Sequence, residues 1–593
     1  MLHLNNEQLR AVRHVDGPML VLAGPGSGKT AVITERIRYL TDTVQVKADS
    51  ILVLTFSNKA AREMQHRLNG SYPVCFGTFH SFFFHVLRQY KNYNNDSIIK
   101  YSQQIAFIRD IGLKLKVREN IDERWCVDTL SDISSYKNTE RMPKYLTDEE
   151  LKLFPELLNE YCIRLKNSGL IDFDDMIGES LELLSTNPCI LQKLQNRFKY
   201  ILVDEFQDCN KDQYELLKLM AGDRCNIFAV GDDDQAIYAF RGSDTQIIFK
   251  LLNDYPDCSI VELTRNYRCS GKIIDYAYEL IGHNKTRKIK KKQLPSKLRG
   301  EGIVSVIRTD DAYTEAAEVC GIIESVNKEG VKLSDISVLY RTDTASDYLL
   351  EYLSDNKIKS NKTNSGDFKE KEYVKDILAY LCISQGDYSR SNFLRILNKP
   401  DRRLVRECVC ENTSRESMLL YYENDDLSRL QISEMFDGIT YISDLQPFAA
   451  IHYIWKRIGY GKYYGSDDIP NDLIEYAGKY TSIKKLVNSF IYNTGPKIIQ
   501  SRNDGDGVVL QTIHASKGLE YDTVIIIGMQ EGIMPHNKAR SEEEIEEERR
   551  LMYVAMTRAK NRLYIIARGK ESHGKKYSRF IYELSKDYKS ISS

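Results

Sequence analysis

Short apolar runs of strand length recur along the chain, and helical patterns separate them. In the first half they cover residues 18–23, 51–56, 200–203 and 226–230, with a shorter strand-like segment before Gly77. In the second half they cover residues 303–308, 336–341, 508–513, 523–528 and 562–567. Apolar runs of four to eight residues that alternate with amphipathic helices indicate parallel sheets. We therefore predict an α/β fold in which the second set of strands repeats the arrangement of the first.

The alternation of strand and helix stops twice. Helical patterns rich in Tyr, Lys and acidic residues run from about 86 to 188, and a second Tyr-rich helical stretch runs from about 381 to 500. These stretches read as helical insertions. The predicted domains are a first α/β domain (1–85 and 189–280), its helical insertion (86–188), a second α/β domain (281–380 and 501–593) and a short helical insertion (381–500).

The first apolar run leads directly into a glycine-rich turn and a helix. The turn and helix start read Ala23, Gly24, Pro25, Gly26, Ser27, Gly28, Lys29 and Thr30. Such a turn points backbone N–H groups at a triphosphate, and the new helix adds the positive end of its dipole. Lys29 would reach the β- and γ-phosphates, and the Thr30 hydroxyl would bind Mg²⁺. Ala23 replaces the usual first glycine, at a position that only has to be small.

Acidic and amide side chains follow two later strands. Asp204 and Glu205 end the run at 200–203, and Gln235 follows the run at 226–230. Because open parallel sheets bind ligands at the carboxyl ends of their strands, these groups should complete the nucleotide site. Asp204 would hold Mg²⁺, Glu205 would polarise the attacking water, and Gln235 would sense the γ-phosphate.

Three further residues could contact the nucleotide. The amide of Gln8 suits the Hoogsteen edge of adenine, although by itself Gln8 is better explained as a surface glutamine. The ring of Tyr267 can stack on adenine while Arg268 reaches the phosphates.

Exposed aromatic residues next to small polar groups suit single-stranded nucleic acid, because bases stack on rings and phosphates accept hydrogen bonds. The candidates in the first half are Phe56, Asn58, Thr78, His80, Tyr238, Phe240 and Arg241. Phe173, in an Asp-rich cluster, could stack on a base or be buried at a helix cap; the sequence leaves both open. The run Phe82–Phe84 is better explained as core.

Two charged runs are interpreted as solvent-exposed. The basic run at 287–292 is slightly favoured as a solvated linker over a phosphate contact, and the acidic run at 542–547 as a solvated helix face.

The composition describes a globular protein without a global charge bias. The chain has 593 residues with a formal net charge of -1, so nucleic-acid binding would depend on local patches. Twelve cysteines occur without a C-x-x-C pair, which is typical of reduced thiols. With no signal-like start and no membrane-length apolar run, we expect a cytoplasmic protein, nucleoid-associated if bacterial.

The motifs in order resemble the UvrD/Rep/PcrA family of superfamily 1 DNA helicases. They read AGPGSGKT, LTFSNKAAREM, GTFHS, VDEFQD, VGDDDQAIYAFRGS and NYR. The resemblance covers most of the chain and implies two RecA-like domains that use ATP and Mg²⁺. It also implies 3′→5′ movement on single-stranded DNA and at single-strand/duplex junctions, by a monomer or a weakly self-associating protein. Many relatives carry Trp where this chain has Phe240.

The resemblance continues in the second α/β domain. It implies that Thr512, His514 and Ser516 contact the DNA backbone, that Glu520 approaches the ATP ribose or the γ-phosphate side, and that Arg558 is the arginine finger. Two alternatives stay open: a translocase that displaces proteins from DNA and unwinds poorly alone, and a non-motor P-loop ATP-binding module. The first predicts weak strand displacement, and the second predicts slow ATP hydrolysis that ignores DNA.

Overall fold

The computed structural model describes most of the chain. The residues outside the description are 1–3, 69, 71, 119–120, 122, 144–145, 239–241, 244–245, 288, 290, 297–299, 363–371, 411–412, 465–468, 470–472, 474–476, 478–479, 492–506, 570–575 and 585–593. The chain divides into two compact units, one formed by residues 1–353 and 512–593 and the other by residues 354–511. Among the described helices, none is both long and apolar enough to cross a membrane.

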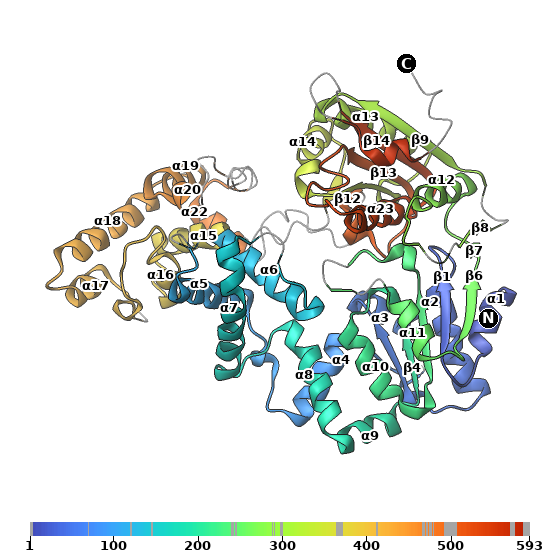
Figure 1. Cartoon of the computed structure of the whole chain (residues 1–593). Coiled ribbons are helices and arrows are strands. Elements are labelled where there is room, and N and C mark those ends of the chain that lie inside the picture. The colour runs from blue at the N-terminus through green and yellow to red at the C-terminus, as the bar shows by residue number, and fades with distance from the viewer. Residues whose placement is uncertain are drawn as a thin grey trace. The chain divides into compact units, whose positions relative to one another are not determined.

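The first sheet of the larger unit has six parallel strands in the order β3-β2-β4-β5-β1-β6 (Figure 1). The strands are β1 (Met19–Ala23), β2 (Ile51–Thr55), β3 (Cys75–Thr78), β4 (Tyr200–Val203), β5 (Ile227–Gly231) and β6 (Ser259–Leu263). The associated helices are α1 (Asn6–Arg13), α2 (Lys29–Arg38), α3 (Asn58–Arg67), α4 (Phe79–Tyr90), α10 (Lys211–Ala221) and α11 (Ile247–Asp254).

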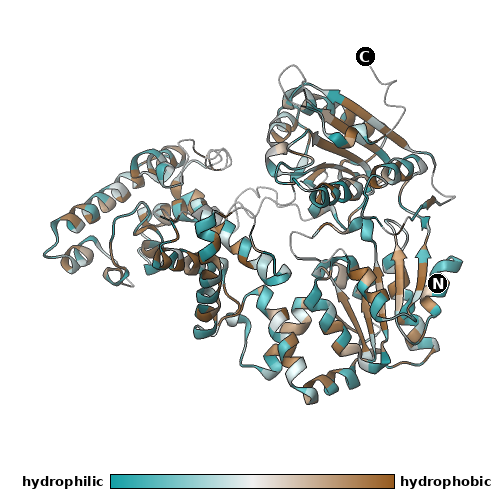
Figure 2. Cartoon of the chain, in the orientation of Figure 1, coloured by the Kyte–Doolittle hydropathy of each residue, from teal (hydrophilic) through white to brown (hydrophobic). Residues whose placement is uncertain are grey.

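Both faces of this sheet are buried. Leu20 and Leu22 of β1 enter one core cluster, while Met19, Val21 and Ala23 enter another. Successive side chains of a strand point to opposite faces, so this division shows helices on both sides. Figure 2 shows the apolar colour concentrated on the strands and mixed colours on the helices. The run Phe82–Phe84 belongs to the first cluster, which confirms it as core.

The sixth strand, β6, was not predicted. Ser259, Ile260 and Glu262 are exposed, so this edge strand lacks the continuous apolar run by which the other strands were recognised.

A helical segment lies between β3 and β4 in the sequence, as expected. It contains α5 (Tyr101–Leu115), α6 (Glu123–Thr139), α7 (Asp148–Asn167), α8 (Phe173–Thr186) and α9 (Pro188–Arg197). Its own core cluster includes Ile108, Phe154 and Tyr161, which are at most 2% exposed.

The second sheet places β10 (Ile336–Tyr340), β13 (Tyr521–Met529), β14 (Ala559–Arg568) and β9 (Ile303–Thr309) side by side in that order, all parallel. The helices of this region are α12 (Gly271–Ile281), α13 (Ala312–Lys328), α14 (Asp347–Asp355), α23 (Glu542–Met556) and α24 (Arg579–Tyr582). A short parallel pair, β7 (Arg265–Asn266) and β8 (Leu294–Pro295), precedes the sheet. The predicted strands of this half are confirmed.

The acidic run at 542–547 is not uniformly solvated. Glu546 is 4% exposed and accepts hydrogen bonds from the backbone N–H of Lys285 (2.5 Å) and of Thr286 (3.2 Å). The solvated interpretation is therefore wrong at Glu546, because the segment after α12 packs on this face of α23.

The smaller unit is mainly helical. Its helices are α15 (Glu372–Ser384), α16 (Arg390–Ile396), α17 (Arg415–Tyr421), α18 (Asp426–Ser443), α19 (Pro447–Tyr453), α20 (Tyr460–Tyr463) and α22 (Ile483–Ile491). The strands β11 (Ser360–Lys362) and β12 (Val508–Thr512) pair in parallel where the chain enters and leaves it. The core includes Tyr380, Phe393 and Trp455.

Candidate functional site

The glycine-rich turn joins β1 to α2, and its backbone requires glycine. Gly26 and Gly28 have φ angles of +67° and +89°, in the left-handed region. A Cβ at Gly26 would lie 2.5 Å from Cβ of Arg268, so the loop also has no room for a side chain. The helix begins at Lys29, which leaves its first N–H groups facing the turn. The predicted strand, turn and helix are confirmed.

Gln8 is buried rather than on the surface. It is 4% exposed, and its Nε2 donates to the carbonyl of Ser27 at 2.9 Å. Gln8 and Asn5 also cap the start of α1 reciprocally. Tyr267 approaches the same turn from another segment: its N–H donates to the carbonyl of Gly26 at 2.8 Å, and its hydroxyl accepts from Asn5 Nδ2 at 3.1 Å. Both residues therefore lie against the glycine-rich turn.

The two carboxylates after β4 have opposite electrostatic environments. Glu205 lies with φ +52°, and Lys29 Nζ is 3.2 Å from its Oε2. Although burial opposes ionisation, Lys29 and Lys517 lower the pKa of Glu205 to about 2. Asp204 is 7% exposed, and burial together with neighbouring Glu205 raises its pKa to about 7.

Asp204 also has an orphaned oxygen. Its Oδ1 is buried and has no hydrogen-bond partner among the described residues. A buried carboxylate oxygen without a donor suits a hard cation, because Mg²⁺ prefers oxygen ligands. Asp204 therefore fits the role of metal ligand that the sequence suggests.

Gln235 connects the first sheet to the second. It follows β5 in the short turn Asp233–Gln235 and is 2% exposed. Its Nε2 donates to Asp232 Oδ2 at 2.6 Å, and its Oε1 accepts from Arg558 Nη2 at 3.3 Å. Arg558, at the start of the segment leading into β14, also donates from Nε to the carbonyl of Val554 at 2.9 Å. Burial and neighbouring Arg268 lower the pKa of Arg558 to about 9, so it stays cationic at neutral pH.

Arg268 lies against Gly26 of the glycine-rich turn and also reaches a residue beside the second sheet. Its Nε donates to Glu520 Oε2 at 2.7 Å, and Lys560 Nζ lies 3.0 Å from Glu520 Oε1. Burial opposes ionisation, but Arg268 and Lys560 lower the pKa of Glu520 to about 2. Arg268 and Glu520, which the sequence assigned to the same nucleotide, therefore lie together.

Lys517 is a site residue that the sequence reasoning missed. Its Nζ lies 2.5 Å from Asp208 Oδ2, 3.0 Å from the carbonyl oxygen of Gln235 and 4.9 Å from the ring centroid of Tyr238. Burial raises the pKa of Asp208 to about 6 in spite of this lysine. Lys517 directly follows Ser516, which the resemblance named, so its position was visible although its partner was not.

The basic run at 287–292 is not a solvated linker. Arg287 donates from Nε and Nη2 to the two carboxylate oxygens of Asp234, both at 2.9 Å. Lys291 is 9% exposed, lies 2.5 Å from Asp232 Oδ1 and also contacts Asp233. The solvated interpretation is wrong at these two positions, because the run packs on the acidic turn after β5. Lys288 and Lys290 lie outside the described residues.

Aromatic side chains gather at the carboxyl edge of the first sheet. Phe56 and Tyr238 stack with ring centroids 4.5 Å apart and planes 17° apart, and Phe56 is 42% exposed. The ring of His514 lies 6.3 Å from that of Tyr238. These three predicted nucleic-acid residues are therefore brought together, whereas Phe240 and Arg241 lie outside the described residues.

A second aromatic pair lies on α4 and α8. His80 and Phe173 meet edge to face at 6.1 Å, and Phe173 is 60% exposed. Asp172, not Phe173, caps α8 by accepting from Asp175 N at 2.8 Å. The prediction that Phe173 is buried at a helix cap is therefore wrong. The alternative, that the exposed ring of Phe173 stacks on a base, stays a prediction.

The small polar candidates differ in exposure. Asn58 is exposed at the first residue of α3, and Thr78 caps α4 through a hydrogen bond from Ser81 N. Thr512 accepts from Ala515 N at 3.4 Å. Ser516 is fully buried and donates to the carbonyl of Ile513 at 2.6 Å, so the structure does not bring it to the surface.

Comparisons with known proteins place most of the chain in one family. Residues 4–256 match the UvrD/REP helicase N-terminal domain, and residues 261–427 and 472–570 match the UvrD-like helicase C-terminal domain. YjcD of Bacillus subtilis is 33% identical over 98% of this chain and 81% of its own length. The ATP-dependent DNA helicase PcrA of Staphylococcus aureus is 33% identical over 95% of this chain and 83% of its own. The ATP-dependent DNA helicase Rep of Salmonella typhimurium is 31% identical over 99% and 94%, respectively. The chain belongs to the UvrD-like helicase family.

Proposed function

We propose that this protein is an ATP-dependent DNA helicase that moves 3′→5′ along single-stranded DNA and separates strands at single-strand/duplex junctions. The observation that carries the proposal is the contact between Arg558 and Gln235, because it joins an element beside each sheet at one site (3.3 Å). Family membership supports the same function, since the relatives PcrA and Rep are named ATP-dependent DNA helicases.

We assign the triphosphate to the glycine-rich turn, from Ala23 to Gly28, together with Lys29. Gln8 and Tyr267 would contact the adenine, and their contacts with the turn support this; Glu520 would approach the ribose or the γ-phosphate side, as the resemblance suggests. Thr30 and Asp204 would hold Mg²⁺, which neutralises phosphate charge when bound. The orphaned Asp204 Oδ1 supports this assignment.

The proposed hydrolytic roles follow from charge and position. Glu205 is ionised and orients the attacking water as a hydrogen-bond acceptor. Gln235 senses the γ-phosphate, and Arg268 and Arg558 stabilise the negative charge of the transferring phosphoryl group. An arginine in this role is worth on the order of 10³–10⁵ in rate.

We propose that bases of single-stranded DNA stack on Phe56 and Tyr238 of the aromatic cluster formed by Phe56, Tyr238 and His514, while His514 contacts the DNA backbone. Stacking a base on a side chain is worth about 1–3 kcal/mol, and an average DNA stacking step is worth about 1.4 kcal/mol. The two nearly cancel, so stacking can trap an opened base pair but cannot impose direction. Alternating grip by two α/β domains through the ATP cycle can supply the direction.

The test compares ATP hydrolysis and strand separation on partial duplexes with 3′ or 5′ single-stranded tails. We expect single-stranded DNA to raise the ATPase rate at least tenfold and only the 3′-tailed duplex to be unwound. Strong ATPase stimulation with negligible unwinding would instead favour a translocase that displaces proteins. An ATPase rate that ignores DNA would favour a non-motor P-loop module.

A further inference from the structure

Arg287, Ile289 and residues 291–295, which the structure describes between α12 and the second sheet, include two residues that contact the turn after β5; we call these described residues the strap. It connects α12 to the second sheet and carries β8, which pairs with β7. Two of its cations contact the turn after β5: Arg287 binds Asp234 through two parallel hydrogen bonds, and Lys291 contacts Asp232 and Asp233. The strap thus fixes the turn that carries Gln235.

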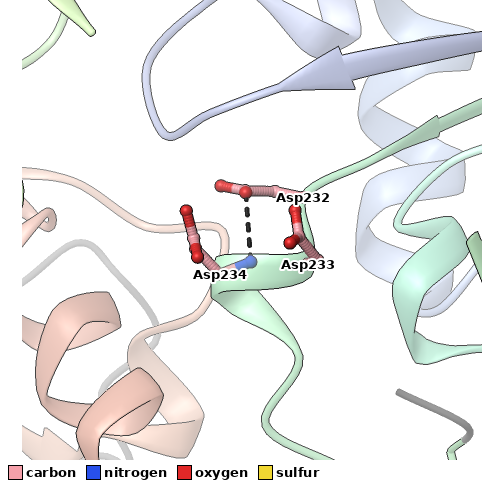
Figure 3. A group of neighbouring side chains, drawn as sticks. All are labelled: Asp232, Asp233 and Asp234. Carbon is pink, nitrogen blue, oxygen red and sulfur yellow. Dashed lines mark hydrogen bonds between the residues drawn. The ribbon is translucent and has the colours of Figure 1, made fainter. Parts of the chain in front are cut away.

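Three consecutive carboxylates form that turn. Figure 3 shows Asp232, Asp233 and Asp234 together, with the hydrogen bond from Asp234 N to Asp232 (3.2 Å). One carboxylate oxygen from each lies within 4.8 Å of the others, a spacing that could also hold a metal ion. Like charges at this distance repel strongly when buried, so the turn requires a cation.

Lys291 supplies that cation from the strap. Its Nζ lies 2.5 Å from Asp232 and 3.8 Å from Asp234, and it contacts Asp233 as well. Burial opposes ionisation of Asp232, but Lys291 and Lys29 keep the pKa of Asp232 below its usual value. Asp232 is therefore an ionised carboxylate, which can only accept hydrogen bonds.

The ionised state of Asp232 fixes the orientation of the Gln235 amide. Asp232 Oδ2 can receive only the amide nitrogen, which lies 2.6 Å away. The amide oxygen must then point to the other side, where it accepts from Arg558 at 3.3 Å. A neutral Asp232, or one turned away by its neighbours, would no longer select this orientation.

We propose that Lys291 is a positioning residue for ATP hydrolysis, whose ammonium is the built-in cation of the three-aspartate turn and holds Gln235 so that its amide oxygen faces Arg558. This inference rests on the proposed function. It predicts an effect on turnover rather than on binding, because the ion pairs of the Lys291 ammonium go to the three aspartates of the turn after β5.

The experiment compares Lys291→Met, Lys291→Arg and the wild type in DNA-stimulated ATP hydrolysis. We expect Lys291→Met to lower kcat at least tenfold while KM for ATP and the half-saturating DNA concentration stay within threefold. Lys291→Arg should recover kcat to within threefold of the wild type. Lys272→Met is the matched control, since Lys272 is an exposed lysine on α12 (54% exposed side chain) paired only loosely with Glu301 (3.6 Å); its kcat should be unchanged.

Two further variants sharpen the test. Lys291→Met combined with Asp233→Asn should turn over several-fold faster than Lys291→Met alone, because one of the repelling carboxylates has been neutralised. If Lys291→Met does not fold, Asp232→Asn takes its place and should show the same loss of kcat with KM retained. A kcat within twofold of the wild type in a folded Lys291→Met or Asp232→Asn protein would overturn the inference, as would equal slowing by Met and Arg.

A thermal-shift measurement separates this inference from the proposed function. With the ammonium removed, the three carboxylates can take up a divalent cation, so calcium chloride should raise the melting temperature of Lys291→Met more than that of the wild type. Equal shifts would contradict the role of Lys291, whatever the ATPase shows. A wild type without DNA-stimulated ATPase but with a larger calcium shift in the variant would count against the proposed function alone.

Discussion

At the scale of residues, adjacent side chains acquire opposite chemistry from their surroundings. Asp204 and Glu205 are neighbours in sequence, yet the pKa of Asp204 is raised to about 7 by burial, while lysines lower the pKa of Glu205 to about 2. Ionising Asp204 therefore costs free energy that a bound cation could offset. Glu205 stays ionised and can accept hydrogen bonds. This difference is the physical basis for assigning metal binding to one and water activation to the other.

The cost at Asp204 can be measured through stability. Between pH 3.8, the ordinary pKa of an aspartate, and about pH 7, Asp204 keeps its proton in the folded protein but loses it in the unfolded chain. The free energy of unfolding therefore falls as the pH rises through that window. Asp204→Asn removes the cost. In magnesium-free buffer its melting temperature should match the wild type near pH 4 and exceed it at pH 8, where the raised pKa of Asp204 costs the wild type on the order of 4 kcal/mol.

Glu205→Gln is the control with the opposite sign. Because the pKa of Glu205 is lower in the folded protein than in the unfolded chain, its ionisation stabilises the fold above pH 4.5. This stabilisation is lost as the pH falls toward about 2. At pH 8 this variant should therefore melt below the wild type. Two variants that shift in the same direction at pH 8 would contradict the assigned charge states.

Residue types, spacing and the family resemblance named the members of the candidate site, but not their partners. Lys29, Asp204, Gln235 and Arg558 were named from sequence and lie at one site. Lys517 and Lys291 were missed because a lysine has no recognisable role until its carboxylate partner is known. Asp208 is 309 positions away from Lys517, and no local pattern links them.

At the scale of elements, the glycine-rich turn is the most constrained segment. Gly26 combines a φ of +67° with a Cβ position 2.5 Å from Arg268 Cβ, whereas Gly17 has a φ of +87° and open space around it. Comparing substitutions at Gly17 and Gly26 therefore separates the effect of backbone strain from the effect of close packing. Strands with continuous apolar runs were predictable, but β6 was not, because an edge strand needs few buried residues.

Alanine at the two glycines tests this distinction. Gly17→Ala and Gly26→Ala should each lose about 1 kcal/mol of stability from backbone strain. Only Gly26→Ala should also weaken binding of a fluorescent ATP analogue, by at least tenfold, because its Cβ displaces Arg268. Equal binding by both variants would show that the turn tolerates a side chain and that its close contact with Arg268 is unimportant.

At the scale of the whole molecule, two parallel sheets contribute to one site. Alternating strand and helix patterns predicted both sheets, because parallel strands buried on two faces read as apolar runs. The mainly helical insertions were predicted from the interruption of that alternation. Their internal packing was not, since helical periodicity indicates which face is apolar but not which helix will cover it.

The shared site also implies how hydrolysis is coupled to movement. Arg268 binds Glu520, Arg558 binds Gln235 and Lys517 binds Asp208, so three cations connect segments of the first sheet with segments of the second. A change in nucleotide state at one side therefore has a direct physical route to the other. The central claim is that neither sheet hydrolyses ATP efficiently without the other.

Turnover by Arg558→Ala, measured at saturating single-stranded DNA with ATP affinity determined on the same preparation, tests that claim most directly. The account predicts that kcat falls on the order of 10³-fold or more while ATP affinity stays within tenfold of the wild type. A folded Arg558→Ala protein that hydrolyses ATP at the wild-type rate would contradict it, because the second sheet would then contribute nothing essential to the reaction.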